Sequence, residues 1–306
     1  MTQKLFKNVL IIGVGLIGSS IARALRNYKL TDQIVGCDIA TQVKDKCKEL
    51  KIIEQFIDSI ENFNDHFDLI IMCSPLSTYR HIFKSLNRQV KQKCIVTDVG
   101  STKLSAINDF KSTCNNNLIS YIPGHPIAGL EKSGPEYGFS ELFHNRFCIL
   151  TPFDYDDQAL ESVKKMWEVF GMKVEYMNAD HHDKVLAMTS HVPQLIAYSI
   201  VATATELEKN MKEEVIKYSA AGFRDFTRLA GSDPIMWRDV YTLNKDAVLE
   251  MLGRFTEDLT SLQKAIRNND TKLLEKVFKS TKEIRKLIEI SGQACSFDPT
   301  ETDKKI

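Results

Sequence analysis

The stretch "IIGVGLIGSS", Ile11 to Ser20, decides the fold of the amino-terminal half. Its three glycines have GxGxxG spacing and lie between an apolar run and a helical pattern, the context of a dinucleotide-binding turn. The first glycine permits a tight turn, the second lets a pyrophosphate approach the backbone, and the third lets the helix pack on the strand. A merely tight strand-to-helix turn is the alternative. We expect the pyrophosphate to lie at the helix N-terminus, against Gly13, Val14, Gly15, Leu16, Ile17 and Gly18.

Two further strand ends are expected at the same edge of the sheet. Asp38 ends the second apolar run, where a carboxylate accepts hydrogen bonds from ribose hydroxyls and repels a 2′-phosphate. The residues that follow, "IATQV", contain no Arg or Lys, so the pattern favours NAD over NADP. The next run ends in "CSPLS", where Ser74 and Pro75 are expected to line the dinucleotide crevice.

The wider pattern predicts an α/β fold followed by helices. Apolar runs such as "QIVGCD", "DLIIMCSP" and "CIVTDVG" alternate with helical patterns, which indicates a parallel sheet covered on both faces. Further strands are expected in "LISYIP", "FCILTP" and "KVEYM", after which the pattern is helical almost throughout. We therefore predict a Rossmann-type dinucleotide-binding domain over residues 1–178 and an all-helical domain over residues 179–306.

Composition narrows the class of partner. The 306 residues carry 40 Lys and Arg against 40 Asp and Glu, so no overall field favours nucleic acid or an acidic membrane surface. A small molecule or a second copy of the chain is the expected partner. The seven cysteines are scattered without metal-ligand spacing, which predicts reduced core thiols and no metal site. With no signal peptide and no apolar run of membrane-spanning length, we expect a cytoplasmic protein.

The histidine in "YIPGHPIAG", Tyr121 to Gly129, is the first candidate for chemistry. Prolines and glycines on both sides of His125 predict a stiff turn, and a neutral imidazole can accept a proton at physiological pH. A hydrogen-bonded structural histidine is the alternative. The "ADHHDK" stretch, with His181 and His182, is interpreted as a helix start capped by Asp180.

Four stretches together resemble the prephenate/arogenate dehydrogenase family of tyrosine biosynthesis, and the resemblance covers nearly the whole chain. They are "TDVGSTK" (Thr97 to Lys103), "GHPIAGLEKSG" (Gly124 to Gly134), "SHVPQ" (Ser190 to Gln194) and "GFRDFTRLAGSDPIMWRD" (Gly222 to Asp239).

The resemblance implies a reaction and roles for particular residues. It implies NAD-dependent oxidative decarboxylation of prephenate, with His125 accepting the proton of the C4 hydroxyl as hydride leaves C4. Ser101 is implied to orient that hydroxyl and the histidine, Arg228 to bind a substrate carboxylate, and His191 to lie at the substrate's side-chain end. The resemblance also implies a homodimer formed through the helical domain, with the interface beside the site. Arogenate, or both compounds, is the alternative substrate.

The chemistry of Arg228 agrees with its implied role. A guanidinium forms a planar fork that matches a carboxylate, and Asp225, three residues earlier, is expected to orient it. An ordinary ion pair of Arg228 with Asp225 or Asp233 is the alternative, and His191 by itself could equally be a core histidine.

Two positions do not decide between prephenate and arogenate as the substrate. Glu131 could orient His125, meet the amine of arogenate or cap a helix. Gln194 stands where the family often has a second histidine. A β-hydroxyacid-type dehydrogenase and a non-catalytic NAD-binding sensor are more distant alternatives; the first should carry a catalytic lysine on its helical domain, and the second should lack proton-transfer groups.

Overall fold

The structure of the chain is a computed structural model that describes residues 4–61, 63, 65–206, 214, 217–218 and 220–290. The chain divides into two compact units, residues 1–248 and 249–306, which are described separately below. Cys295 lies outside the described residues, and the six other cysteines are free thiols.

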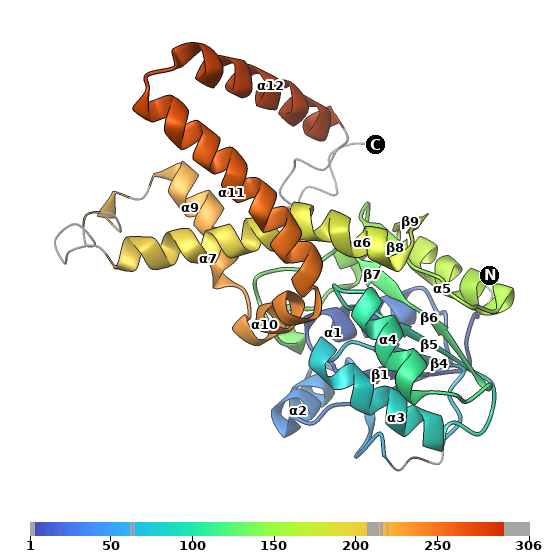
Figure 1. The fold of residues 1–306 in the computed structure, drawn as a ribbon. Coiled ribbons are helices and arrows are strands. Elements are labelled where there is room, and N and C mark those ends of the chain that lie inside the picture. The colour runs from blue at the N-terminus through green and yellow to red at the C-terminus, as the bar shows by residue number, and fades with distance from the viewer. Residues whose placement is uncertain are drawn as a thin grey trace. The chain divides into compact units, whose positions relative to one another are not determined.

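A six-stranded parallel sheet forms the centre of the first unit (Figure 1). Its strand order, β3-β2-β1-β4-β5-β6, is that of a dinucleotide-binding Rossmann fold, as the sequence predicts. The short strand β3 was not expected. The strands are β1 (Asn8–Ile12), β2 (Gln33–Cys37), β3 (Gln55–Ile57), β4 (Leu69–Met72), β5 (Cys94–Asp98) and β6 (Ile119–Ile122).

Helices cover both faces of this sheet, which explains why β4 is apolar throughout and β1 is apolar after Asn8. Val9 and Ile11 of β1 pack in one cluster with α1 and α5, whereas Leu10 and Ile12 pack in a second cluster with α3 and α4. Figure 1 shows α3 and α4 side by side in front of the strands. The helices of this half are α1 (Leu16–Asn27), α2 (Thr41–Glu49), α3 (Tyr79–Gln89), α4 (Leu104–Thr113) and α5 (Asp157–Val169).

A small second sheet holds the candidate histidine. Its order is β7 (Gly124–Pro126), β8 (Phe147–Leu150) and β9 (Lys173–Tyr176), with β7 antiparallel to β8 and β8 parallel to β9. His125 pairs with Ile149, so the expectation of a turn at this histidine is wrong. The backbone of Gly124 to Pro126 is straightened because it pairs with β8.

Every element that the structure describes after β9 is helical, and a long helix opens this part. Residues 179–205 form one continuous helix, made of α6 (Ala179–Leu186), a π-helical turn (Ala187–His191) and α7 (Val192–Thr205). The described part of the first unit after this helix includes α9 (Ala221–Thr227), a 3₁₀ turn (Arg228–Gly231) and α10 (Pro234–Leu243). The domain boundary expected between residues 178 and 179 stays a prediction.

The helix over 179–205 is long and apolar enough to cross a membrane, by length and composition only. We expect no such run from the sequence, and this expectation is wrong. The polar side chains of His182, Asp183 and His191, which lie on this helix, are buried in contacts with the rest of the first unit. Of the apolar window in this helix, 33% is buried.

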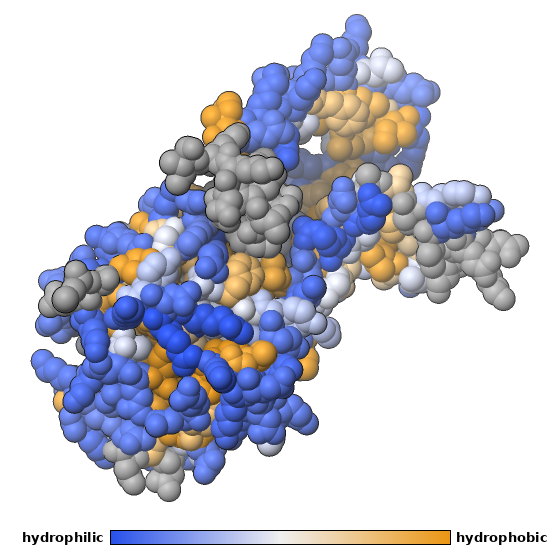
Figure 2. Space-filling model, turned by 180° about the vertical axis from the view of Figure 1, so that it is seen from behind, coloured by the Kyte–Doolittle hydropathy of each residue, from blue (hydrophilic) through white to orange (hydrophobic). Residues whose placement is uncertain are grey.

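The second unit is a helical hairpin. It contains most of α11 (Lys245–Arg267) and all of α12 (Thr271–Ile290), and no residue of α12, which is described throughout, is buried. Large apolar side chains are exposed along the two helices, and Figure 2 shows apolar residues gathered on this hairpin. They include Leu259, Ile266, Phe278, Ile284 and Leu287.

Candidate active site

The glycine-rich turn between β1 and α1 has the geometry that a dinucleotide needs. Gly13 has φ +86°, and a Cβ there would lie 2.7 Å from the backbone nitrogen of Ser74. A Cβ on Gly18 would lie 2.2 Å from the carbonyl oxygen of Gly13, so helix and strand pack too closely for alanine. A Cβ on Gly15 would meet no protein atom within 4 Å. The first and third glycines therefore serve the protein's own packing, and the second leaves backbone open to a ligand.

The surroundings of this turn fit NAD. Helix α1 follows Gly15, no described side chain caps it, and its first turn contains no acidic residue, so its N–H groups and dipole suit a pyrophosphate. Asp38 accepts hydrogen bonds from the backbone N–H groups of Val14 and Ala40, both at 2.9 Å, which fixes its carboxylate beside the turn. A carboxylate has about four acceptor positions, so capacity for ribose hydroxyls remains.

The predicted crevice residues after β4 lie next to the glycine turn. Ser74 is the residue whose backbone approaches Gly13, and its hydroxyl pairs with that of Thr78 at 2.8 Å. Pro75 precedes a short 3₁₀ turn. Val14 and Leu16 are buried and Ile17 is partly buried against the core, so these three contribute mainly backbone to the turn.

A buried ion pair joins the loop after β5 to the strand that carries His125. The Lys103 ammonium pairs with Asp98, and both side chains are 0% exposed. Lys103 also donates to the carbonyl of Gly124 at 2.6 Å, and Asp98 accepts from Tyr121 and from the Gly124 N–H. Because these bonds connect Tyr121 and Gly124, which precede His125, to the end of β5 and the loop that carries Ser101, they fix the backbone on which the site is built.

His125 itself is 8% exposed and hydrogen-bonded to a second histidine. Its Nδ1 lies 2.9 Å from Nε2 of His182, and Nδ1 of His182 lies 2.7 Å from Oδ1 of Asp183. Burial lowers the pKa of His125 well below its usual value, and the neighbouring His182, Lys103 and His191 lower it further. The imidazole is therefore neutral at physiological pH and has the capacity to accept a proton.

His182 and Asp183 are not among the site residues that the sequence predicts. The helix that contains them is capped by Asn178, whose side chain accepts from the His181 N–H at 2.8 Å, and not by Asp180. The helix starts two residues earlier than expected, and His182, which lies within it, is fully buried and contacts His125.

His191 lies in the π-helical turn, and Pro193 explains that turn. A proline lacks the N–H that continues the α-helical ladder, and its ring crowds the carbonyl four residues earlier. His191 is fully buried, and its Nδ1 accepts from the side chain of Asn244 at 3.1 Å. Its Nε2 is buried without a hydrogen bond from any described residue, and burial lowers the pKa of His191 to about 4. A buried donor of this kind is suited to an acceptor on a bound molecule.

Arg228 pairs with Glu131, which lies in the loop after β7. The arginine side chain is 60% exposed and the glutamate side chain 34%. Asp225 instead lies beside Arg224, 3.8 Å away, so the expected orientation of Arg228 by Asp225 is not what the structure has. The reason is local: α9 ends at Thr227, and Arg228 begins a 3₁₀ turn where the helical spacing no longer holds.

A side-chain contact holds the turn that contains Arg228, whereas the role of Ser101 is not decided by its contacts. Gln194 donates to the carbonyl of Leu229 at 2.6 Å, which ties the 3₁₀ turn of Arg228 to the helix of His191. Ser101 is half-buried between β5 and α4, and no hydrogen bond links it to His125 among the residues that the structure describes. Its role in orienting the hydroxyl stays a prediction.

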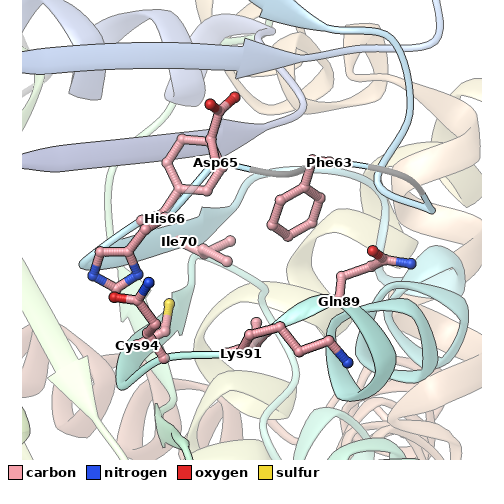
Figure 3. A pocket seen from close by; sticks show the side chains of 10 residues that line it. Phe63, Asp65, His66, Ile70, Gln89, Lys91 and Cys94 are labelled. Atoms are coloured by element: carbon pink, nitrogen blue, oxygen red, sulfur yellow. The ribbon is translucent and has the colours of Figure 1, made fainter.

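A separate pocket of about 160 Å³ lies at the amino-terminal ends of β4 and β5. Figure 3 shows Asp65, His66, Lys91 and Cys94 among the side chains around it. The carboxyl ends of the strands, where α/β sheets bind ligands, are at the opposite edge of the sheet. We assign no function to this pocket.

Comparison with known proteins identifies the family. The chain matches the family model "prephenate dehydrogenase, nucleotide-binding domain" over residues 21–176 and the model "prephenate dehydrogenase, dimerization domain" over residues 178–280. It is 36% identical to a cyclohexadienyl dehydrogenase of Zymomonas mobilis, covering 92% of this chain and 95% of the relative. It is 31% identical to a prephenate dehydrogenase of Bacillus subtilis, covering 90% of this chain and 75% of the relative.

A solved structure agrees. The crystal structure of prephenate dehydrogenase from Aquifex aeolicus, in complex with hydroxyphenyl propionate and NAD+, has a TM-score of 0.83 to this chain. The two are 36% identical, and the match covers 92% of this chain and 98% of the other. With a Rossmann sheet, a neutral buried histidine and matches over both halves, the chain belongs to the prephenate dehydrogenase family.

Proposed function

We propose that this protein is an NAD-dependent prephenate dehydrogenase, which converts prephenate to 4-hydroxyphenylpyruvate, CO2 and NADH in tyrosine biosynthesis. The observation that carries the proposal is His125, a buried neutral base in the strand that follows the Rossmann sheet. When bound, NAD+ supplies the hydride acceptor.

Each site residue has a separate role in the proposed reaction. His125 accepts the proton of the C4 hydroxyl as hydride leaves C4, and Ser101 orients that hydroxyl. Arg228 binds a substrate carboxylate, and His191 lies at the side-chain end, where its unpartnered Nε2 can donate. Loss of the ring carboxylate as CO2 makes the ring aromatic, and the oxygen regains a proton as a phenol. The negative charges of the substrate raise the pKa of His125 on binding, which makes it a stronger base.

Glu131 and Arg228 bear on substrate choice. The pair balances both charges, and we expect a substrate carboxylate to compete with Glu131 for the guanidinium. The released Glu131 carboxylate is then a candidate partner for the amine of arogenate. The similarity to a protein named cyclohexadienyl dehydrogenase favours arogenate, or both compounds, as the second candidate substrate.

A homodimer through the helical half is part of the proposal. The matching family model is named for dimerization, and the hairpin of α11 and α12 exposes apolar side chains that a second copy can cover. The molar mass of the protein in solution, measured by light scattering, tests this. A monomer at micromolar concentration contradicts it. We also propose a cytoplasmic location, supported by the free, mostly buried cysteines among the described residues.

The reaction is tested by supplying prephenate and arogenate separately with NAD+ and following the absorbance of NADH. Prephenate is expected to give the higher kcat/KM, and turnover with neither compound contradicts the proposed function. His125→Asn is the matched control: it should bind NAD+ normally and lower kcat by about 10²- to 10⁴-fold, the usual contribution of a positioned general base.

A further inference from the structure

Three buried side chains form a hydrogen-bonded chain that starts at His125. His125 contacts His182 through Nδ1 and Nε2, and His182 contacts Asp183 through Nδ1 and Oδ1. The exposed fractions of the three residues are 8%, 0% and 3%, so water does not compete for these bonds. These hydrogen bonds connect the imidazole of His125, on β7, to helix α6.

Asp183 sets the direction of the hydrogen bonds. Its Oδ1 accepts from the backbone N–H of Lys103 at 2.8 Å, and its Oδ2 accepts from the backbone N–H of Leu104 at 3.0 Å. Both oxygens are therefore acceptors, which makes Nδ1 of His182 the donor. The two backbone bonds also hold the carboxylate at the N-terminus of α4, where the helix dipole favours negative charge.

The position of each ring proton follows from that direction. A neutral His182 with its proton on Nδ1 has a bare Nε2, which can only accept. His125 must then donate from Nδ1, and its own Nε2 is bare. Burial lowers the pKa of both histidines, which is consistent with two neutral rings.

We propose that His182 and Asp183 are positioning residues that hold His125 in the tautomer with a bare Nε2, the atom that accepts the proton of the substrate. The inference rests on the proposed function, since it assigns the atom that takes that proton. Once protonated, His125 is a cationic donor to His182, a stronger hydrogen bond than the neutral one, and Asp183 places negative charge at the end of the chain. A carboxylate that fixes the tautomer of a catalytic histidine contributes up to about 10⁴-fold to kcat.

The charged groups around the two histidine rings have opposite effects on ring protonation. Lys103, in the loop before α4, disfavours protonation of both rings, and His191, in the π-helical turn, does the same for His125. Asp183, and more weakly Asp98 of β5, favour protonation of His182. The pH dependence of turnover therefore belongs to the histidine pair, and a change at His182 is expected to alter it.

Two substitutions of His182 separate positioning from mere packing. The amide of His182→Asn lies near the former Nδ1, so it keeps a donor to Asp183 but does not reach His125. The longer His182→Gln places an amide oxygen near the former Nε2, where it accepts from His125. We expect His182→Asn to lower kcat by about 10²- to 10³-fold with KM for prephenate and for NAD+ nearly unchanged, and His182→Gln to recover at least about tenfold of that loss.

The tautomer is also measured directly, without turnover. In protein labelled with ¹⁵N-histidine, the ring nitrogen shifts of His125 are expected to show a protonated Nδ1 and a bare Nε2 in wild type and His182→Gln. In His182→Asn the two tautomers are expected to mix. A protonated Nε2 in wild type, or equal kcat and pH profiles for both variants at equal thermal stability, overturns the proposal. Because the nitrogen shifts need no substrate, they remain decisive even if neither prephenate nor arogenate is turned over.

Discussion

The two ion pairs connected to the strand and loop of His125 differ in their contact with water. Lys103 and Asp98 are both fully buried, whereas Arg228 and Glu131 are 60% and 34% exposed. Separating the first pair leaves a charge in the protein interior, where it is not solvated. Separating the second leaves both charges accessible to water or to another ion. We infer that the buried pair fixes the backbone of the site, and that the exposed pair can exchange a partner for substrate.

The largest effect is expected from breaking the buried pair. Lys103→Met leaves Asp98 without its counter-ion and should lower the free energy of unfolding by about 3 to 5 kcal/mol. Urea unfolding at pH 7 measures this. The double variant with Asp98→Asn removes the uncompensated charge and is expected to recover part of the loss. If Lys103→Met lowers the free energy of unfolding by less than about 1 kcal/mol, the buried pair contributes no more than an exposed pair does.

Substitution of Arg228 should weaken substrate binding more than it lowers the stability of the fold. Arg228→Lys loses the planar fork, and kcat/KM for prephenate should fall about 30- to 1000-fold, which is about 2 to 4 kcal/mol. Because the carboxylate is present in ground and transition states alike, most of the loss should be a higher KM. Arg224→Lys, four residues earlier and beside Asp225, is the matched control and should change neither constant.

An unchanged KM together with a lower melting temperature in Arg228→Lys contradicts this assignment. It would make Arg228 a structural residue, and the carboxylate would have to bind elsewhere.

Burial should also be visible in the pH dependence of stability. The pKa of His191 is lowered from 6.5 to about 4 in the folded protein, so the unfolded chain binds more protons and stability falls as the pH drops below about 6.5. Between pH 7 and pH 5 wild type should lose about 2 kcal/mol more than His191→Asn, whose amide can still accept from Asn244. Equal losses in urea unfolding at the two pH values would show that His191 is not buried as a neutral ring.

The smallest effect is expected at Glu131. Glu131→Gln removes the exposed partner of Arg228 and should change the free energy of unfolding by less than about 1 kcal/mol. KM for prephenate should stay the same or fall, because the guanidinium no longer has a competing carboxylate. A loss of stability above about 2 kcal/mol would remove the distinction between the two pairs.

The parts of the site that depend on local sequence were predictable. Gly13 and Gly18 are fixed by contacts with their own strand and its neighbour, and Asp38 by its place at a strand end. The parallel sheet followed from continuous apolar runs, because strands covered on both faces need apolar residues at every position.

The parts that depend on distant contacts were not predictable. Nothing in "ADHHDK" distinguishes a capping residue from a buried partner of His125, since that pairing joins β7 to a helix that starts more than fifty residues later. The pairing of Arg228 with Glu131 is also long-range, and the local alternative, Asp225, failed because the helix ends between them. Strand β7 was misread as a turn for the same reason, because its partner strand β8 comes later in the chain.

The π-helical turn over Ala187–His191 decides how this segment responds to changes in length. A π-helical turn holds one residue more than an α-helical one, so deleting one residue there would give a regular helix. Because the π-helical turn winds more slowly, its extra residue adds almost no rotation, and the residues on either side would keep nearly the same orientation after that deletion. One residue inserted in the α-helical part between His182 and this turn would instead rotate all later residues by about 100°, since an α-helix has 3.6 residues per turn. His182 would keep its place while His191 and Gln194 rotated away from Asn244 and Leu229. Such an insertion would separate the proton-accepting half of the site from the half that holds the substrate.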